Sequence, residues 1–252
     1  RESIDLDFSM RHDFPDGPEA VQARIEIALQ RTFRPAGYEP FDFKMEERPA
    51  EVSPDLADFW GGYGVEFKLV PNAQFAELKN DLPKLRNAAL SIGQGRKFFI
   101  DISRFEYIDD KEPKDLDGYR IYVYSPLMIA CEKLRAICQQ MNEYAPVVKR
   151  DNRPGSQRAR DFLDIHVLVE SLRLDMLSPK AIDITRQMFA LKRVKLDWLG
   201  NIENYREFHR QGFPSVKDTV SRNFDLQEFD FYVDYVVKLA NDILTEVHAT
   251  PV

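Results

Sequence analysis

The chain has 252 residues, of which 44% are hydrophobic and 31% are charged, and its formal net charge at pH 7 is -7. This length supports one large domain or two domains of ordinary size, each with its own core. The acidic balance argues against a general polyanion-binding protein, and no apolar run approaches the roughly 18 residues of a membrane span, so we expect a soluble cytoplasmic protein without a membrane partner.

The first half of the chain alternates the patterns of strands and helices. Ile4, Leu6 and Phe8 alternate with polar residues, which is the period of a β-strand. Asp16-Gly17-Pro18 then predicts the start of a helix. Further strands are predicted around residues 41–45, 65–69, 97–103 and 119–124, and a helix is predicted over residues 73–91, interrupted at Pro83.

Beyond Pro126 the apolar residues recur at helical spacing instead. Cys131 and Cys138 lie seven residues apart on one apolar stripe, which favours two reduced core residues over a disulfide or a metal site. Helices are predicted from residue 126 onward and over residues 158–172, 179–191 and 226–248. The expected fold is of the α+β class, with a mixed α/β domain over residues 1–124 and a helical bundle over residues 125–252.

Two carboxylates share one side of the first predicted strand. Asp5 and Asp7 are two residues apart, so they point to the same face while their apolar neighbours point to the core. Adjacent carboxylates repel each other unless a cation lies between them, and Mg²⁺ is commonly held by such oxygen ligands together with substrate phosphates. The alternative is the solvent face of an edge strand.

A third carboxylate interrupts another apolar strand. Asp101 follows Phe98, Phe99 and Ile100, and a carboxylate on a neighbouring strand would complete a two-metal site. Glu66 is the competing candidate. We prefer Asp101, because Lys68 lies two residues from Glu66 on the same face and could form an ordinary surface pair with it.

The helical half contributes one lysine and two further carboxylates. Lys133 flanks the apolar stripe, where it could neutralise a triphosphate or extend along the core toward solvent. Asp161 and Asp164 share a helix face, where Arg158 and Arg160 could pair with them in a structural ladder. Other local interpretations are an ion pair between Glu132 and Arg135, a structural role for His166, and RNA-backbone contacts from a basic loop with Lys149, Arg150 and Arg153.

These motifs resemble the AbiEii family of nucleotidyltransferases, the toxin components of type IV toxin–antitoxin and abortive-infection systems. The segment 1–8 is similar to that family's D-x-D strand, Glu132-Lys133-Leu134 to its lysine-bearing helix, and residues 160–164 to its Arg-Asp-x-x-Asp helix. The Gly-Ser or Gly-Thr element that precedes the D-x-D strand is expected to lie before Arg1. The resemblance implies a polymerase β-like nucleotidyltransferase domain with an added helical domain.

The resemblance also implies an activity: transfer of a nucleoside monophosphate from a nucleoside triphosphate to the 3′ end of a tRNA, although some relatives modify protein. The expected metal is Mg²⁺ or Mn²⁺, held by Asp5, Asp7 and Asp101, and the expected partner is a cognate antitoxin. Lys133, Asp161 and Asp164 complete the predicted catalytic set, and the predicted substrate-binding residues are Ser3, Lys133, Arg158 and Arg160. The alternatives are a non-catalytic binding or interaction module of the same fold and a metal-dependent phosphohydrolase.

Overall fold

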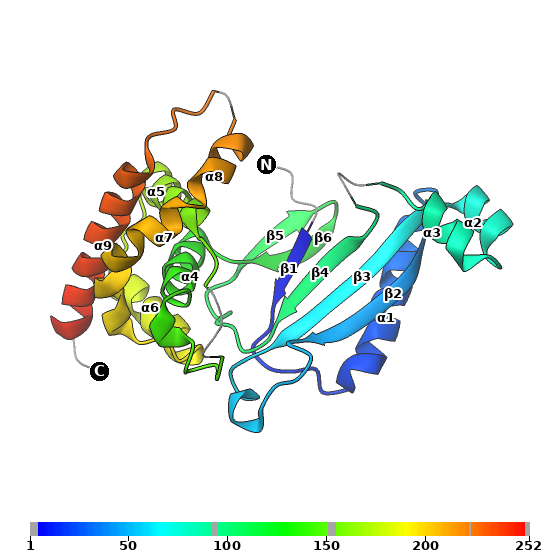
Figure 1. The fold of residues 1–252 in the computed structure, drawn as a ribbon. Helices are drawn as coiled ribbons and strands as arrows, with labels where there is room; N and C mark the ends of the chain where they lie inside the picture. The colour runs from blue at the N-terminus through cyan, green and yellow to red at the C-terminus, as the bar shows by residue number, and fades with distance from the viewer. Residues whose placement is uncertain (1–4, 92–94, 151–154, 222, 250–252) are drawn as a thin grey trace. The chain divides into compact units, whose positions relative to one another are not determined.

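The computed structural model describes residues 5–91, 95–150, 155–221 and 223–249 (Figure 1). The chain forms two compact units that divide between Glu106 and Tyr107. The boundary predicted at residues 124 and 125 differs from this division, because a hairpin over residues 112–123 groups with the helices.

The first unit is built on a four-stranded mixed sheet in the order β1-β4-β3-β2. Strand β1 runs parallel to β4, whereas the β4–β3 and β3–β2 pairs are antiparallel. Strand β1 is therefore an edge strand, and β4 is its neighbour. The strands span Asp5–Ser9 (β1), Tyr38–Arg48 (β2), Gly62–Pro71 (β3) and Phe98–Ser103 (β4).

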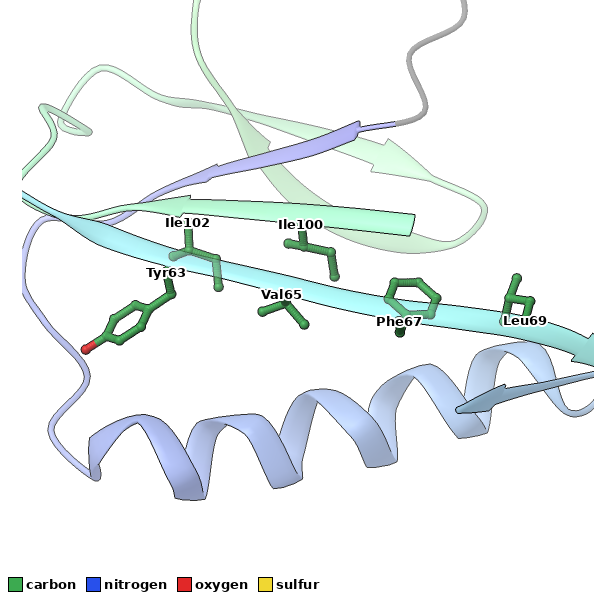
Figure 2. Close-up of a cluster of buried hydrophobic side chains, with 6 residues drawn as sticks. All are labelled: Tyr63, Val65, Phe67, Leu69, Ile100 and Ile102. Atoms are coloured by element: carbon green, nitrogen blue, oxygen red, sulfur yellow. The ribbon is translucent and has the colours of Figure 1, made fainter. Parts of the chain in front are cut away.

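One face of this sheet is apolar and lies against helix α1 (Gly17–Phe33), as Figure 2 shows. Alternate residues of β3 and β4 supply the buried cluster, which Ile25, Leu29 and Phe33 of α1 complete. Burial of these side chains stabilises the sheet and commits the intervening residues to the opposite face. The cluster consists of Tyr63, Val65, Phe67, Leu69, Ile100 and Ile102.

A short helical pair follows β3. The predicted helix over residues 73–91 is divided into α2 (Asn72–Leu78) and α3 (Leu82–Ala88). The break is explained by Pro83, which lies in the first turn of α3, and by Asp81, whose side chain accepts the backbone N–H of Lys84 (3.2 Å). A one-turn 3₁₀ helix, η1 (Pro54–Leu56), lies between β2 and β3.

The second unit contains a hairpin and a group of helices. The hairpin pairs β5 (Glu112–Leu116) with β6 (Tyr119–Val123), and only β6 was predicted. The predicted helices are present as α4 (Pro126–Cys138), α5 (Ala159–Leu172), α6 (Pro179–Leu191) and α9 (Phe229–Ala249). The unpredicted elements are η2 (Asn142–Tyr144), η3 (Leu196–Tyr205), α7 (Arg206–Arg210) and α8 (Phe213–Thr219).

Two of these helices begin at a serine followed by a proline. Ser125 and Ser178 accept backbone N–H groups three residues onward, from Met128 (3.2 Å) and Ala181 (3.3 Å), at the starts of α4 and α6. The core between the helices includes fully buried side chains from α4, α5 and α6: Met128, Leu134, Ile137, Phe162, Ile165, Ile184 and Phe189.

The two cysteines are buried and free, as predicted. Burial raises the pKa of the Cys131 thiol to about 11 and raises the pKa of Cys138 as well. Both side chains therefore serve as apolar core residues. Among the described residues, no helix has the length and apolar character that crossing a membrane requires.

Candidate functional site

Asp7 and Asp101 lie side by side in the sheet. The parallel register of β1 and β4 pairs Asp7 with Asp101 directly, and Asp5 with Phe99. Residues paired in this way point to the same face of a sheet. The Asp101 side chain is 47% exposed. The predicted pairing of a D-x-D carboxylate with Asp101 is thus present in the register, whereas the side chain of Asp5 and the whole of Ser3 lie outside the described residues.

The face that carries these carboxylates is the one opposite α1. Ile100 and Ile102 flank Asp101 and are buried on the α1 side, so Asp101 projects from the other side. Gly64 of β3 pairs with Asp101 on that face. The carboxylate pair therefore lies on the polar face of the sheet.

Arg48 reaches across Gly64 to the carboxylates. Its Nη1 atom donates to Oδ1 of Asp101 (3.2 Å), and its Nη2 atom lies 3.6 Å from Oε1 of Glu66. A Cβ atom at Gly64 would overlap the Arg48 guanidinium, so glycine here provides the space for this contact. Arg48 was not among the predicted site residues, because nothing in its local pattern links it to a strand more than fifty residues away.

Glu66 occupies a different position from Asp101. It belongs to β3, which β4 separates from β1. The Lys97 ammonium donates to Glu66 Oε2 (2.5 Å) and holds the pKa of that carboxyl below its ordinary value. The predicted surface pair between Glu66 and Lys68 is wrong: Lys68 instead forms an ion pair with Asp42, because the bulge in β2 brings that carboxylate closer.

Lys133 joins two helices of the second unit. Its Nζ atom on α4 donates to Oδ1 of Asp161 (2.8 Å) and to Oδ2 of Asp164 (2.9 Å), both on α5. The Lys133 and Asp161 side chains are only 18% and 9% exposed. The three predicted residues therefore form one partly buried cluster, rather than separate surface groups.

Two arginines extend this cluster. Nε of Arg158 lies 3.0 Å from Oδ2 of Asp161, and Nε of Arg160 lies 3.1 Å from Oδ1 of Asp164, as the predicted ladder requires. Burial acts to lower the pKa of Lys133, but the charges and hydrogen bonds of the two aspartates exceed this effect and raise the pKa. The ammonium is consequently charged at neutral pH. The local pair predicted between Glu132 and Arg135 is also present (2.9 Å).

Two histidines lie in the helical core. His166 contacts the rings of Phe231, Tyr232 and Tyr235, in agreement with the predicted structural role. His209 is fully buried, and its Nδ1 atom accepts the backbone N–H of Arg158 (3.0 Å) at the start of α5. Burial, with a smaller contribution from the charge of Arg158, lowers the pKa of His209 to about 4. Sequence patterns did not identify this residue, because its helix α7 has only five residues.

The predicted RNA-contacting loop is described only in part. Lys149 and Arg150 are exposed, and Lys149 has a left-handed backbone (φ 52°). Arg153 lies outside the described residues. Across the part of the chain that the structure describes, no group of three or more histidine, cysteine, aspartate or glutamate side chains is arranged to hold a metal ion. Asp7 and Asp101 are neighbouring carboxylates in the register of β1 and β4.

Comparison with known proteins identifies the family. No curated protein matched the chain. A crystal structure described as a putative nucleotidyltransferase from H. pylori aligns with 13% sequence identity and a TM-score of 0.42, covering 99% of this chain and 81% of that chain. The family model described as "Nucleotidyl transferase AbiEii toxin, Type IV TA system" matches residues 1–234. Because that match spans both units and every predicted motif, the chain belongs to the AbiEii family of nucleotidyltransferase toxins of type IV toxin–antitoxin systems.

Proposed function

We propose that this protein transfers a nucleoside monophosphate from a nucleoside triphosphate to the 3′ end of an RNA, with tRNA as the favoured acceptor, and that it does so with Mg²⁺ or Mn²⁺. The observation that carries the proposal is the direct register of Asp7 with Asp101 on the polar face of the sheet. Family membership supports the reaction class.

The donor set fits a hard divalent cation. Asp7 and Asp101 offer carboxylate oxygens from neighbouring parallel strands, and Asp5 lies two residues from Asp7 on β1. Bound there, Mg²⁺ would neutralise phosphate charge and orient the triphosphate. Asp7 and Asp101 are the residues proposed to hold it, and Asp5 is proposed as a third ligand.

Asp101 has a second proposed role, as the general base. Its carboxylate would accept the proton of the acceptor hydroxyl while that oxygen forms a bond to the α-phosphorus. The bond from the α-phosphorus to the β-phosphate oxygen breaks at the same time, and pyrophosphate leaves. Arg48 supports this role as a positioning residue, because its contact with Oδ1 holds the Asp101 side chain in place.

Lys133, Arg158 and Arg160 are proposed as nucleotide-binding residues. Lys133, Arg158 and Arg160 face the carboxylates of Asp161 and Asp164, so the cluster has one more positive charge than negative. This excess suits a polyanionic substrate. Asp161 and Asp164 would keep Lys133 charged and oriented. The proposal extends to Ser3 as a triphosphate contact, to Lys149, Arg150 and Arg153 as RNA contacts, and to a cognate antitoxin as the protein partner.

The reaction class can be tested by incubating the full-length protein with each α-labelled nucleoside triphosphate, Mg²⁺ and total RNA. The proposal predicts label in the RNA and release of pyrophosphate. Label released as free nucleotide without incorporation would instead indicate a phosphohydrolase. Nucleotide binding without any product would indicate a non-catalytic module.

A further inference from the structure

A second feature of the first unit lies outside the carboxylate pair. A cavity of about 420 Å³ opens beside β2 and β3. Glu66 and Lys68 line it and alternate with the buried residues Val65 and Phe67, so they belong to the same polar face as Asp101. The charged residues that line the cavity are Asp42, Lys44, Glu66, Lys68, Arg86 and Lys97.

The charges around this cavity are unbalanced in favour of cations. Four lining side chains are positive and two are negative, in a chain whose net charge is -7. The two carboxylates are already neutralised, Asp42 by Lys68 and Arg86 and Glu66 by Lys97. The side chains of Lys44 and Lys97 are 57% and 48% exposed, and Lys44 pairs with Glu46 (2.7 Å), which lies outside the cavity lining. A phosphate would therefore share Lys44 with Glu46 and Lys97 with Glu66. An anion entering the cavity therefore meets cations on its rim and no unneutralised carboxylate in its lining.

Asp42 fixes part of this rim through a left-handed backbone. It lies in the bulge of β2, between Phe41 and Lys44 in the register, with φ at 56°. A left-handed backbone is uncommon for a residue other than glycine, although aspartate adopts it more readily than most, and bulges often reorient a side chain for function. Here the Asp42 carboxylate accepts from Arg86 at 2.5 and 2.8 Å and pairs with Lys68. These contacts hold both cations at the cavity without a ligand, and they lower the pKa of Asp42 to about 2, the hydrogen bonds from Arg86 being the largest cause.

The cavity adjoins the proposed reaction centre along β3. Gly64 pairs with Asp101, and Glu66 and Lys68 follow two and four residues later, which corresponds to roughly 7 and 13 Å along a strand. Arg48 contacts both Asp101 and Glu66, so it links the proposed reaction centre to the lining of the cavity. A triphosphate reacting at Asp101 has only two phosphates beyond the reacting one, whereas a nucleic acid strand repeats a phosphate along its whole length.

We propose that this cavity binds a backbone phosphate of the RNA acceptor and aligns that strand with Asp7 and Asp101. The inference rests on the proposed function, because it takes the carboxylate pair as the reaction centre. Lys44 and Lys97 make the phosphate contacts, and Lys68 and Arg86, fixed by Asp42, supply the surrounding positive potential.

The test measures the affinity of the full-length protein for an unstructured single-stranded RNA, without nucleotide or Mg²⁺, across a range of salt concentrations. The variant Lys44→Gln/Lys97→Gln removes two exposed cations from the cavity. Its plot of log affinity against log salt should be shallower by about 0.7, which is the contribution of one phosphate contact on a single strand. The matched control, Arg24→Gln/Arg31→Gln, removes two exposed cations from α1 on the other side of the sheet and should leave the slope unchanged.

A slope equal to that of the wild type in the cavity variant, or an equal reduction in the α1 control, would overturn the inference. So would a loss of nucleoside triphosphate affinity in the cavity variant with RNA affinity intact, because the cavity would then bind triphosphate. The single variant Lys97→Arg keeps both positive charges, so its salt dependence should be close to that of the wild type. Because binding is measured without turnover, a shallower slope supports the cavity even in a protein that transfers no nucleotide.

Discussion

The Nζ atom of Lys133 on α4 lies 2.8 Å from Oδ1 of Asp161 on α5, and both side chains are largely buried. The contact joins two helices whose paired residues are 28 positions apart, so it differs from a surface pair within one helix. Removing one partner of such a pair leaves the other charge poorly solvated. The cluster therefore combines a structural role with the proposed role in nucleotide binding.

Lys133→Met should lower the free energy of unfolding by roughly 2–4 kcal/mol, because Asp161 would keep only Arg158 as a partner. Denaturant unfolding measures this loss. Lys238→Met on α9 is the matched control, since that lysine is 80% exposed and pairs with Asp242 within one helix. It should cost no more than about 0.5 kcal/mol. Equal losses in both variants would show that the Lys133 cluster is an ordinary surface ladder.

Gly64→Ala should displace the Arg48 side chain, because the added Cβ would occupy the position of the guanidinium. Arg48 is 49% exposed and can move, so the melting temperature should change little. The rate of nucleotide transfer should fall, and Arg48→Gln should lower it similarly, since both changes remove the support of Asp101. The double variant should be no slower than either single variant. If the double variant instead lost activity by the product of the two single reductions in rate, Gly64 and Arg48 would not act through the same contact with Asp101.

Stability should decrease as the pH falls from about 6.5 toward 4, because of His209. The folded state lowers the pKa of this imidazole to about 4, so in that interval only the unfolded state takes up the proton. Above pH 6.5 the imidazole is neutral in both states and does not reduce stability. By pH 4 its protonation in the unfolded state lowers the free energy of unfolding by roughly 3 kcal/mol. Urea unfolding between pH 7 and 4.5 measures the slope. His209→Asn should be less stable at pH 7 but should show a flatter dependence, and an unchanged slope would assign the titration elsewhere.

Most of the regular elements were predictable because they bury one face. Strand β1 is an exception: Leu6 and Phe8, which were predicted to face the core, are 56% and 52% exposed. Alternating residues such as Val65 and Phe67 mark a strand, and helical spacing marks α4 through α6 and α9. Strand β5 was missed because Glu112-Pro113-Lys114-Asp115-Leu116 has a single large apolar residue, Leu116, which is 58% exposed. Its assignment depends on pairing with β6, which local pattern does not encode.

The residues of the site were easier to predict than their partners. A single aspartate in an apolar strand marked Asp101, and the register places it beside Asp7. Arg48, the partner of Asp101, lies at the end of β2, and Lys97, the partner of Glu66, lies directly before β4. Both are far along the chain from the carboxylates they contact, so sequence spacing could not reveal these pairs. The same reason explains why Lys68 was assigned to Glu66 rather than to Asp42. The catalytic roles of these residues stay predictions.

The central claim is that the Asp7–Asp101 pair is the reaction centre, and the most direct test compares two conservative variants of neighbouring carboxylates. The measurement is the initial rate of transfer from α-labelled nucleoside triphosphate to RNA in Mg²⁺, with the melting temperature recorded for each protein. Asp101→Asn should abolish transfer with little change in melting temperature, because the side chain is 47% exposed, and Glu66→Gln should keep most of the activity. Full activity in Asp101→Asn, or its loss only in Glu66→Gln, would contradict the account.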